Sequence, residues 1–316
     1  MSYPAAPLFT DVAEAPDGGA AHWLTASDGV RIRIGHWRPS TGARGTVLLF
    51  PGRTEYVEKY GPAAGDLAAR GLATLAIDWR GQGLADRLQQ DPRPGHIGHF
   101  ADYQKDVAAA LESAIALDLP QPFFLVAHSM GGCIGLRALT EGLPVAAAAF
   151  TGPMWDIDLS PPKRLLARWV TSLGLALGQG NRLMLSTRPD NYVLYQPFDD
   201  NALTTDPEMY RFMQRQLQEH PDLGLGGPSM RWLNEALQET TDLARQPAPD
   251  LPCLTFLGTA ESIVSARAIR TRMAGWPRGR LEMVEGARHE VMMEGPATRA
   301  RAFDQMAAFF SEAAGA

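Results

Sequence analysis

The chain has 316 residues, of which 45% are hydrophobic and 20% charged, so it has enough apolar side chains for one large domain or for a core with an insertion. Lys and Arg number 29 against 35 Asp and Glu, and the net charge of -6 argues against binding nucleic acid by bulk electrostatic attraction. The two cysteines, Cys133 and Cys253, are too few for a disulfide framework or a cysteine-based zinc site.

The hydropathy pattern shows neither a targeting signal nor a membrane span. Residues 1–21 lack the basic start and long apolar run of a secretory signal. No window approaches the ~18 uninterrupted apolar residues that cross a bilayer. We therefore expect a soluble, cytoplasmic protein.

Strand-length and helix-length segments alternate over the first 150 residues. Residues 25–38 alternate apolar and polar side chains, which predicts a half-buried strand. Short continuous apolar runs predict strands buried on both faces of a parallel sheet, at 45–50, 72–77, 122–127 and 145–150. Helix-length stretches lie between them, at 56–70, 103–117 and 130–141. This alternation predicts an α/β fold built from βαβ units.

The pattern changes at Gly152 and Pro153, and no buried strand is predicted from there to about residue 249. Helical stretches at 163–177, 208–218 and 229–243 are separated by Pro, Gly and Asn clusters. Strands are predicted again at 251–257 and 280–284, and a last helix near 297–310. We therefore expect a core formed by 1–152 and 250–316, with a helical insertion at 153–249, because a structureless loop of that length is improbable.

Ser129 is the strongest candidate for a chemical role. It stands in Leu125-Val-Ala-His-Ser-Met-Gly-Gly132, where a buried strand ends and a helix begins. A nucleophile elbow has this form, with small residues two positions before and after the serine. Gly131 supplies one small residue, and Ala127 takes the place of the usual glycine at the other. The alternative is a Gly-rich turn with an N-capping serine.

A nucleophilic serine needs a base, and His289 is the best candidate because it follows the last predicted strand. His128 lies in the turn itself and should point away. His96 and His99 have the i, i+3 spacing of metal ligands, but no third ligand is in view, so we interpret them as loop hydrogen-bonding residues. The remaining histidines lie in early strands or in the insertion: His22, His36 and His220.

A third group should orient the imidazole and stabilise its cation. Glu261 follows the strand predicted at 251–257, so we expect it at the same sheet edge as Ser129 and His289. Glu290 is a weaker candidate, because adjacent side chains point apart, and Glu285 is also near in sequence.

An oxyanion hole needs two backbone donors. One should be the N–H of Met130, and the other that of Arg53, in the loop that follows the strand at 45–50. Gly52 permits a close turn in that loop. Asp78-Trp-Arg-Gly-Gln-Gly83 has the spacing of neither a P-loop nor a dinucleotide-binding turn, so we interpret it as a structural turn that supports the site.

Together these segments resemble the monoacylglycerol lipase and lysophospholipase group of the α/β-hydrolase superfamily, over residues 24–310. The order Ser129, Glu261, His289 is the superfamily's order of nucleophile, acid and base. Pro51, Ala127 and Glu261 stand where the family usually has His, Gly and Asp, and Arg53-Thr-Glu-Tyr-Val-Glu-Lys59 is most similar to the bacterial lysophospholipase branch. Four segments are similar to family motifs: 51–55 to the oxyanion loop, 78–83 to Asp-x-Arg-Gly-x-Gly, 127–132 to the elbow and 286–290 to Gly-x-x-His-Glu.

The resemblance implies an α/β-hydrolase fold, with a mostly parallel sheet flanked by helices and a helical cap at 153–249. It implies a serine hydrolase that cleaves a lysophospholipid or monoacylglycerol ester, without metal or cofactor, and that has Gly52 and His128 near the substrate. Three alternatives use the same triad: a short-chain carboxylesterase, an acyltransferase and a serine peptidase. A non-catalytic binding module is the alternative from another class.

The stretch 163–177 has an apolar face flanked by basic residues. One interpretation is a helix packed on the core. The other is a cap face that lines an acyl tunnel or touches lipid, which predicts substrate contacts from Trp169 and Leu173 and transient binding to a micelle or to the inner membrane face. A second apolar set is predicted as cap core or tunnel wall: Met209, Phe212, Met213 and Leu217.

Overall fold

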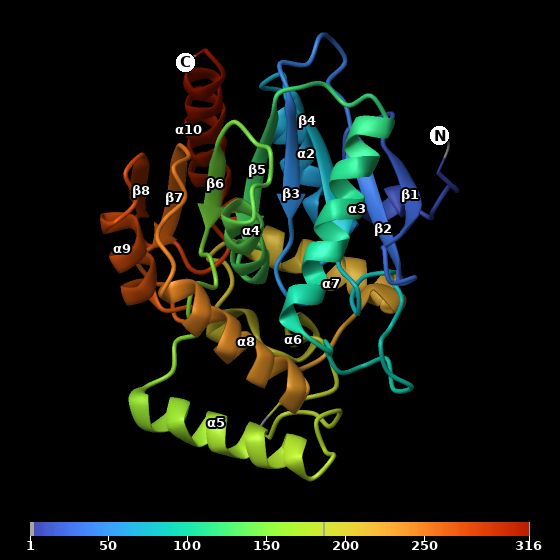
Figure 1. Cartoon of the computed structure of the whole chain (residues 1–316). Coiled ribbons are helices and arrows are strands. Elements are labelled where there is room, and N and C mark those ends of the chain that lie inside the picture. Colours follow the sequence, from blue (N-terminus) through green and yellow to red (C-terminus); the bar gives the residue numbers. More distant parts are fainter. Residues whose placement is uncertain (1–2, 186, 316) are drawn as a thin grey trace.

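The computed structural model describes residues 3–185 and 187–315. An eight-stranded sheet forms its centre, in the order β1-β2-β4-β3-β5-β6-β7-β8 (Figure 1). The strands β3 to β8 are parallel, β2 runs antiparallel to β4, and β1 antiparallel to β2. The bounds are β1 Ala20–Thr25, β2 Arg31–Trp37, β3 Thr46–Phe50, β4 Ala73–Asp78, β5 Phe123–His128, β6 Ala148–Thr151, β7 Cys253–Gly258 and β8 Gly279–Val284. The predicted fold class is confirmed.

Helices cover both faces of the sheet and enclose two hydrophobic cores. Side chains of β3 alternate between them, since Leu48 and Phe50 join one core and Val47 and Leu49 the other. The first core contains α3 (Tyr103–Ala116), α4 (Met130–Thr140) and α9 (Ala266–Ala274), and the second contains α2 (Gly61–Ala68) and α10 (Pro296–Ala314). Shorter helical segments are α1 Thr10–Ala13, η1 Val57–Tyr60, η2 Phe100–Asp102, η3 Phe198–Asp200, η4 Pro221–Leu223 and η5 Val291–Met293. None of the described helices is both long and apolar enough to cross a membrane.

The strand predicted at 25–38 corresponds to β2 and the turn before it, and the preceding strand β1 was not predicted. Thr25 ends β1, and β2 begins only at Arg31. The interior of β2 is buried on both faces rather than half-buried, because β2 pairs with β1 and β4 and lies between the two cores. The alternation in the sequence reflects buried polar side chains, Arg33 above all, whose partners come from distant segments.

Between β6 and β7 the described residues form the helices α5 (Pro161–Ala176), α6 (Tyr192–Tyr195), α7 (Pro207–Glu219) and α8 (Met230–Ala244), together with η3 and η4. The segment lies beyond the carboxyl ends of the parallel strands, with α5 outermost and next to α8 (Figure 1). We refer to residues 153–249 as the cap.

The apolar face of α5 points away from the protein. Its buried positions are the small residues Ala167, Thr171 and Gly174, which allow close packing on α8. A Cβ at residue 174 would lie 2.5 Å from Met230 Sδ. Packing on the small-residue face leaves the larger apolar side chains exposed, contrary to the interpretation of a core-packed helix: Leu165, Leu166, Trp169, Leu173 and Leu177.

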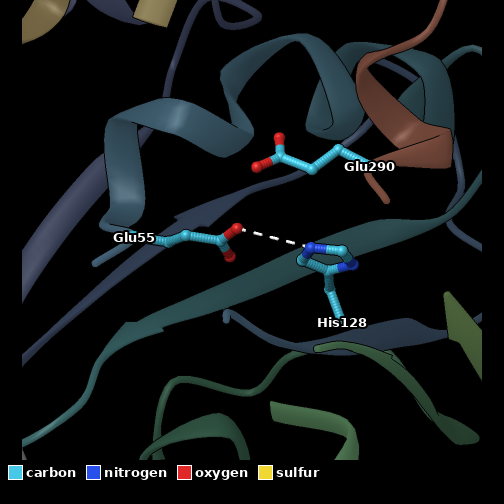
Figure 2. A group of neighbouring side chains, drawn as sticks. All are labelled: Glu55, His128 and Glu290. Atoms are coloured by element: carbon cyan, nitrogen blue, oxygen red, sulfur yellow. Dashed lines mark ion pairs between the residues drawn. The ribbon is translucent and has the colours of Figure 1, made fainter. Parts of the chain in front are cut away.

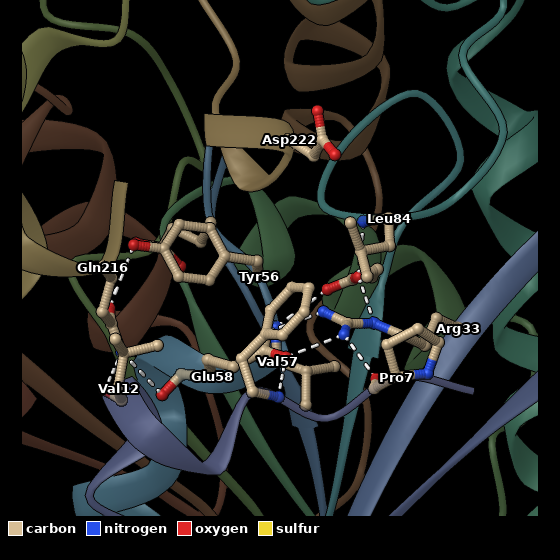
Figure 3. A network of polar contacts seen from close by, with 12 residues as sticks. Pro7, Val12, Arg33, Tyr56, Val57, Glu58, Leu84, Gln216 and Asp222 are labelled. Atoms are coloured by element: carbon tan, nitrogen blue, oxygen red, sulfur yellow. Dashed lines mark hydrogen bonds and ion pairs between the residues drawn. The ribbon is translucent and has the colours of Figure 1, made fainter. Parts of the chain in front are cut away.

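A buried polar network joins the first residues, the core and the cap (Figure 3). The Arg33 guanidinium donates to both oxygens of Glu58, at 2.8 and 2.7 Å, and to the Pro7 carbonyl at 2.8 Å. Gln216 of α7 donates to the Val12 carbonyl at 2.9 Å and to the Glu58 carbonyl at 3.1 Å. These hydrogen bonds connect α7 of the cap to the core.

Candidate active site

Ser129 lies at the sharp turn between β5 and α4. Its backbone has φ 49° and ψ -118°, a conformation that non-glycine residues rarely adopt and that is typical of functional sites. Its carbonyl accepts hydrogen bonds from the N–H groups of Gly132 at 2.9 Å and Met154 at 2.8 Å, which hold the turn. Gly131 is required for close packing, since a Cβ there would lie 2.1 Å from the Phe50 carbonyl oxygen.

Ala127, which departs from the usual glycine, fits because α4 has a second glycine opposite it. A Cβ at residue 135 would lie 3.2 Å from the Ala127 methyl group. Gly135 therefore leaves the space that this methyl group needs, and the elbow keeps its form.

His289 and Glu261 form a hydrogen-bonded pair. The Nδ1 of His289 donates to Glu261 Oε2 at 2.7 Å, and both side chains are almost fully buried. The other carboxylate oxygen accepts from the N–H groups of Ile263 at 2.7 Å and Val264 at 3.1 Å. Burial raises the pKa of Glu261, but the bonds from His289 and the two backbone groups outweigh burial and lower this pKa below its usual value.

Gly152 lies against this pair, at the turn that follows β6. Its φ is +47°, and a Cβ there would lie 3.1 Å from both bonded atoms, His289 Nδ1 and Glu261 Oε2. The alternation of strands and helices in the sequence ends at Gly152, and this is a position where a side chain would disturb the site.

Ser129 and His289 line the same cavity, which has a volume of about 370 Å³. No hydrogen bond within 3.5 Å joins the Ser129 hydroxyl to His289 in the part of the chain that the structure describes. Such contacts are often longer before substrate binds. Of the two other carboxylates considered from the sequence, Glu290 pairs with Lys59, and Glu285 is exposed.

The loop after β3 is held in place by the Asp78–Gly83 turn. Trp79 Nε1 donates to the Pro51 carbonyl at 2.9 Å, and Gln82 Nε2 donates to the Gly52 carbonyl at 2.8 Å. The backbone N–H groups of Arg53 and Met130 have no hydrogen-bond partner among the described residues, so both can donate to a ligand. These contacts support the interpretation of this turn as structural.

Beside this loop lies a buried ionic cluster: Glu55, Lys59, His128 and Glu290. The ammonium of Lys59 pairs with Glu55 Oε1 at 2.8 Å and with Glu290 Oε2 at 2.7 Å. Burial opposes the charge on Lys59, but the two carboxylates outweigh burial and raise its pKa. Because Glu55 also accepts the N–H of Gly52 and Glu290 adjoins His289, the ammonium connects the loop after β3 to the segment that carries His289.

The same cluster contains the one set of potential metal ligands found among the described residues, Glu55, His128 and Glu290 (Figure 2). The Lys59 ammonium already supplies a cation between the two carboxylates. His128 donates from Nδ1 to the Thr151 carbonyl at 2.8 Å, and burial lowers its pKa to about 4. The donor set is therefore better satisfied as an ion-pair network than as a metal site.

The expected substrate-binding residues do not line the cavity. Trp169 and Leu173 are 69% and 60% exposed, because α5 packs on α8 through its small residues. His128 is enclosed beneath the site, and Gly52 turns its N–H to Glu55. His96 lies in a loop, as expected, and bonds Ser229 Oγ at 2.9 Å.

Most of the cavity wall is apolar and comes from the cap and from the loop after β7. Met213 and Leu217 of α7 line it, whereas Met209 and Phe212 are buried in the second core. Most of the remaining lining had no local signal in the sequence: Met154, Ile157, Tyr192, Val193, Leu203, Trp232, Leu233, Ile263 and Val264.

Comparisons with known proteins identify the family of this chain. The family model described as serine aminopeptidase, S33, matches residues 41–296. Lysophospholipase L2 of Escherichia coli is 31% identical and covers 91% of this chain and 86% of its own, and the probable lysophospholipase L2 of Haemophilus influenzae is 29% identical over 86% of both.

Solved structures show the same fold. A soluble variant of monoglyceride lipase from Saccharomyces cerevisiae has a TM-score of 0.70 at 18% identity, covering 92% of this chain and 95% of its own. A carboxyl esterase from Bacillus coagulans has a TM-score of 0.73 at 16% identity, covering 94% and 99%. The chain therefore belongs to the serine aminopeptidase S33 family of α/β hydrolases, in the group that contains lysophospholipases and monoglyceride lipases.

Proposed function

We propose that this protein is a serine hydrolase that cleaves the acyl ester of a lysophospholipid or a monoacylglycerol. The observation that carries the proposal is the His289–Glu261 hydrogen bond at a cavity that Ser129 also lines. The relatives named lysophospholipase L2 support the substrate class.

In the first half of the reaction His289 accepts the Ser129 proton while Oγ attacks the acyl carbonyl carbon. The carbonyl π electrons move to oxygen, and the N–H groups of Arg53 and Met130 stabilise this oxyanion. The carboxylate of Glu261 stabilises the imidazolium. The intermediate then collapses, the ester C–O bond breaks, and His289 returns its proton to the departing glycerol oxygen.

In the second half His289 accepts a proton from water, whose oxygen attacks the acyl-serine carbonyl. A second oxyanion forms in the same place. Its collapse breaks the bond to Ser129 Oγ, which takes the proton back, and releases the fatty acid. Each half uses only groups of this chain, the substrate and water.

The apolar cavity wall favours a long acyl chain. Met154, Met213 and Leu217 lie on this wall, together with Val264 from the loop that carries Glu261. Each methylene that leaves water contributes about 0.8 kcal/mol to binding. The same contacts disfavour a peptide substrate, whose backbone would bury polar groups against apolar side chains.

We also propose that α5 contacts the aggregate in which such lipids occur. Trp169 and Leu173 are exposed, and Lys163 lies at the start of the same helix. Apolar side chains beside a cation are typical of surfaces that bind the lipid–water interface.

The test is fatty-acid release from a lysophospholipid and a monoacylglycerol, with a short-chain aryl ester and an amino-acid arylamide assayed in parallel. We expect release from at least one lipid, and Ser129→Ala and His289→Ala should each lower kcat by about a thousandfold or more. A fluorophosphonate probe should label Ser129 in the unmodified protein.

Activity on the aryl ester alone would contradict the lipid substrate but keep the triad. Cleavage of the arylamide alone would favour a peptidase. A folded protein that neither turns over any substrate nor takes the label would favour a binding module.

A further inference from the structure

The active-site cavity contains a guanidinium without an anionic partner. Arg53 lines the cavity that Ser129 lines, and its side chain reaches from the loop after β3 to the cap. Its Nη1 donates to the Gly226 carbonyl at 2.8 Å, and its Cζ lies 5.4 Å from the centre of the Trp232 ring. Among the described residues no carboxylate lies within 4.0 Å of it, and the ionisable groups that affect its pKa are the tyrosines Tyr103 and Tyr195.

The fully buried cations among the described residues, Arg33, Lys59 and Arg80, are compensated by carboxylates. The partly buried Arg53, Arg87 and Arg272 instead donate to backbone carbonyls. Arg33 pairs with Glu58 and Asp78, and Lys59 pairs with two glutamates. Burial lowers the pKa of Arg53 to about 10, so the side chain is still cationic at neutral pH. An uncompensated cation in a mostly apolar cavity lowers stability unless an anion binds there.

Part of the guanidinium is available to a ligand. An arginine side chain has five N–H donors in a planar fork, and one hydrogen bond of Arg53 to a described residue, Gly226, is found. Its Nε and Nη2 have no hydrogen-bond partner among the described residues, and they are not enclosed by protein atoms. The remaining N–H groups of the guanidinium can donate hydrogen bonds to two oxygens of one anion.

We propose that the Arg53 side chain binds the phosphate of a lysophospholipid substrate, so that the enzyme prefers phosphate-bearing lipids to monoacylglycerols. This inference rests on the proposed hydrolysis of acyl esters. A lysophospholipid carries its phosphate on the same glycerol as the ester, a few bonds from the reacting carbonyl. Arg53 matches that layout, with its backbone N–H at the carbonyl and its guanidinium at the head group.

If Arg53 only connected the cap to the core, then removing another arginine with that role should change substrate preference in the same way. Arg87 has that role without lining the cavity, because it donates to the carbonyls of Gly81 at 2.8 Å, Asp222 at 3.1 Å and Gly224 at 3.0 Å. Arg87→Gln is therefore a matched control, since it too removes an arginine that bonds cap carbonyls.

The experiment compares kcat/KM for lysophosphatidylglycerol and for a monoacylglycerol with the same acyl chain, at equal mole fraction in mixed micelles. In Arg53→Gln we expect the ratio of the two values to fall about 10- to 100-fold, as for a lost charge-assisted pair. Any damage to the oxyanion donor affects both substrates and leaves the ratio unchanged. Arg53→Lys should give an intermediate ratio, because lysine keeps the charge but not the fork.

An unchanged ratio in Arg53→Gln, with the wild-type enzyme active on both lipids, overturns the role of Arg53 and leaves the hydrolase proposal standing. The same ratio change in Arg87→Gln assigns the effect to cap attachment and also overturns it. Wild-type protein that cleaves neither lipid overturns the hydrolase proposal itself, and the phosphate proposal with it.

Discussion

Unusual backbone conformations at single residues position the chemical groups of this protein. Ser129 and Gly152 both have positive φ angles, one at the nucleophile and the other against the His289–Glu261 pair. For Ser129 the strain holds the hydroxyl at the turn between strand and helix. For Gly152 the missing side chain leaves room for the pair.

We expect Gly152→Ala to lower kcat by at least about tenfold, because the methyl group would displace His289 and Glu261 from each other. The matched control is Gly142→Ala. Gly142 also has a positive φ, of 92°, but a Cβ there would have nothing within 4 Å, so that variant has the backbone strain alone. Steady-state kinetics and thermal unfolding of both variants test this, and equal kcat values would contradict it.

Glu261→Gln should lower kcat by about 10²- to 10⁴-fold, and less than Ser129→Ala or His289→Ala, because the imidazolium loses its carboxylate but keeps a neighbour of the same size. Glu285→Gln, an exposed change in the same region, should have no measurable effect. Full activity of Glu261→Gln in steady-state assays would show that another group orients His289.

At the level of the elements, Lys59 joins the segment after β3 to the segment before η5. We expect Lys59→Met to lower the free energy of unfolding by about 3–5 kcal/mol, because Glu55 and Glu290 would remain buried without a counter-charge. Lys105→Met removes a surface ammonium that also pairs with two carboxylates, and should lower the free energy of unfolding far less, because solvent screens exposed pairs. Urea unfolding compares the two, and a similar small loss in both would be incompatible with this argument.

The exposed apolar face of α5 is a second feature of a single element. Trp169→Ser together with Leu173→Ser should weaken binding to anionic lipid vesicles by about tenfold or more, because these side chains no longer leave water. Ile115→Ser is the control, since Ile115 is 56% exposed on α3, outside the cap. Vesicle sedimentation measures both, and equal binding of all three proteins would exclude α5 as the lipid-contacting face.

For the whole molecule, buried histidines set the dependence of stability on pH. Burial lowers the pKa of His36, His96 and His128 to about 4, whereas the unfolded chain has the ordinary value of 6.5. Between these values the unfolded state binds protons that the native state does not, so stability is complete above pH 6.5 and falls as the pH drops toward 4.

We expect the fully buried His128 alone to lower the free energy of unfolding by ~1.4 kcal/mol per pH unit once the pH is well below 6.5. Urea unfolding at pH 7, 6 and 5 measures this loss. The carboxylates whose pKa is lowered, such as Glu55 at about 2, change stability only below that range. Burial raises the pKa of Asp106 to about 6, so this group offsets part of the loss that the three histidines cause. Stability that is constant or higher at pH 5 would contradict the burial of these neutral histidines.

Local patterns were enough to predict the strands of the sheet other than β1 and the order of the three candidate catalytic residues. Apolar runs such as 45–50 and 122–127 match β3 and β5 to within one residue at each end, because a strand buried on both faces needs no polar alternation. Strand ends in a parallel sheet meet at one edge, so Ser129, Glu261 and His289 could be placed together from sequence position alone.

Only the tertiary structure decided what faces the cavity and what faces solvent. The apolar face of α5 was a candidate tunnel wall, but Ala167, Thr171 and Gly174 on the opposite face allow closer packing on α8, and helix packing depends on a partner surface distant in sequence. The absence of a carboxylate near the Arg53 guanidinium, and the pairing of Lys59 with two glutamates, were likewise decided by the tertiary structure. Whether a charge is paired depends on groups brought from other segments, whereas a residue's place on a strand or helix depends on its neighbours in the chain.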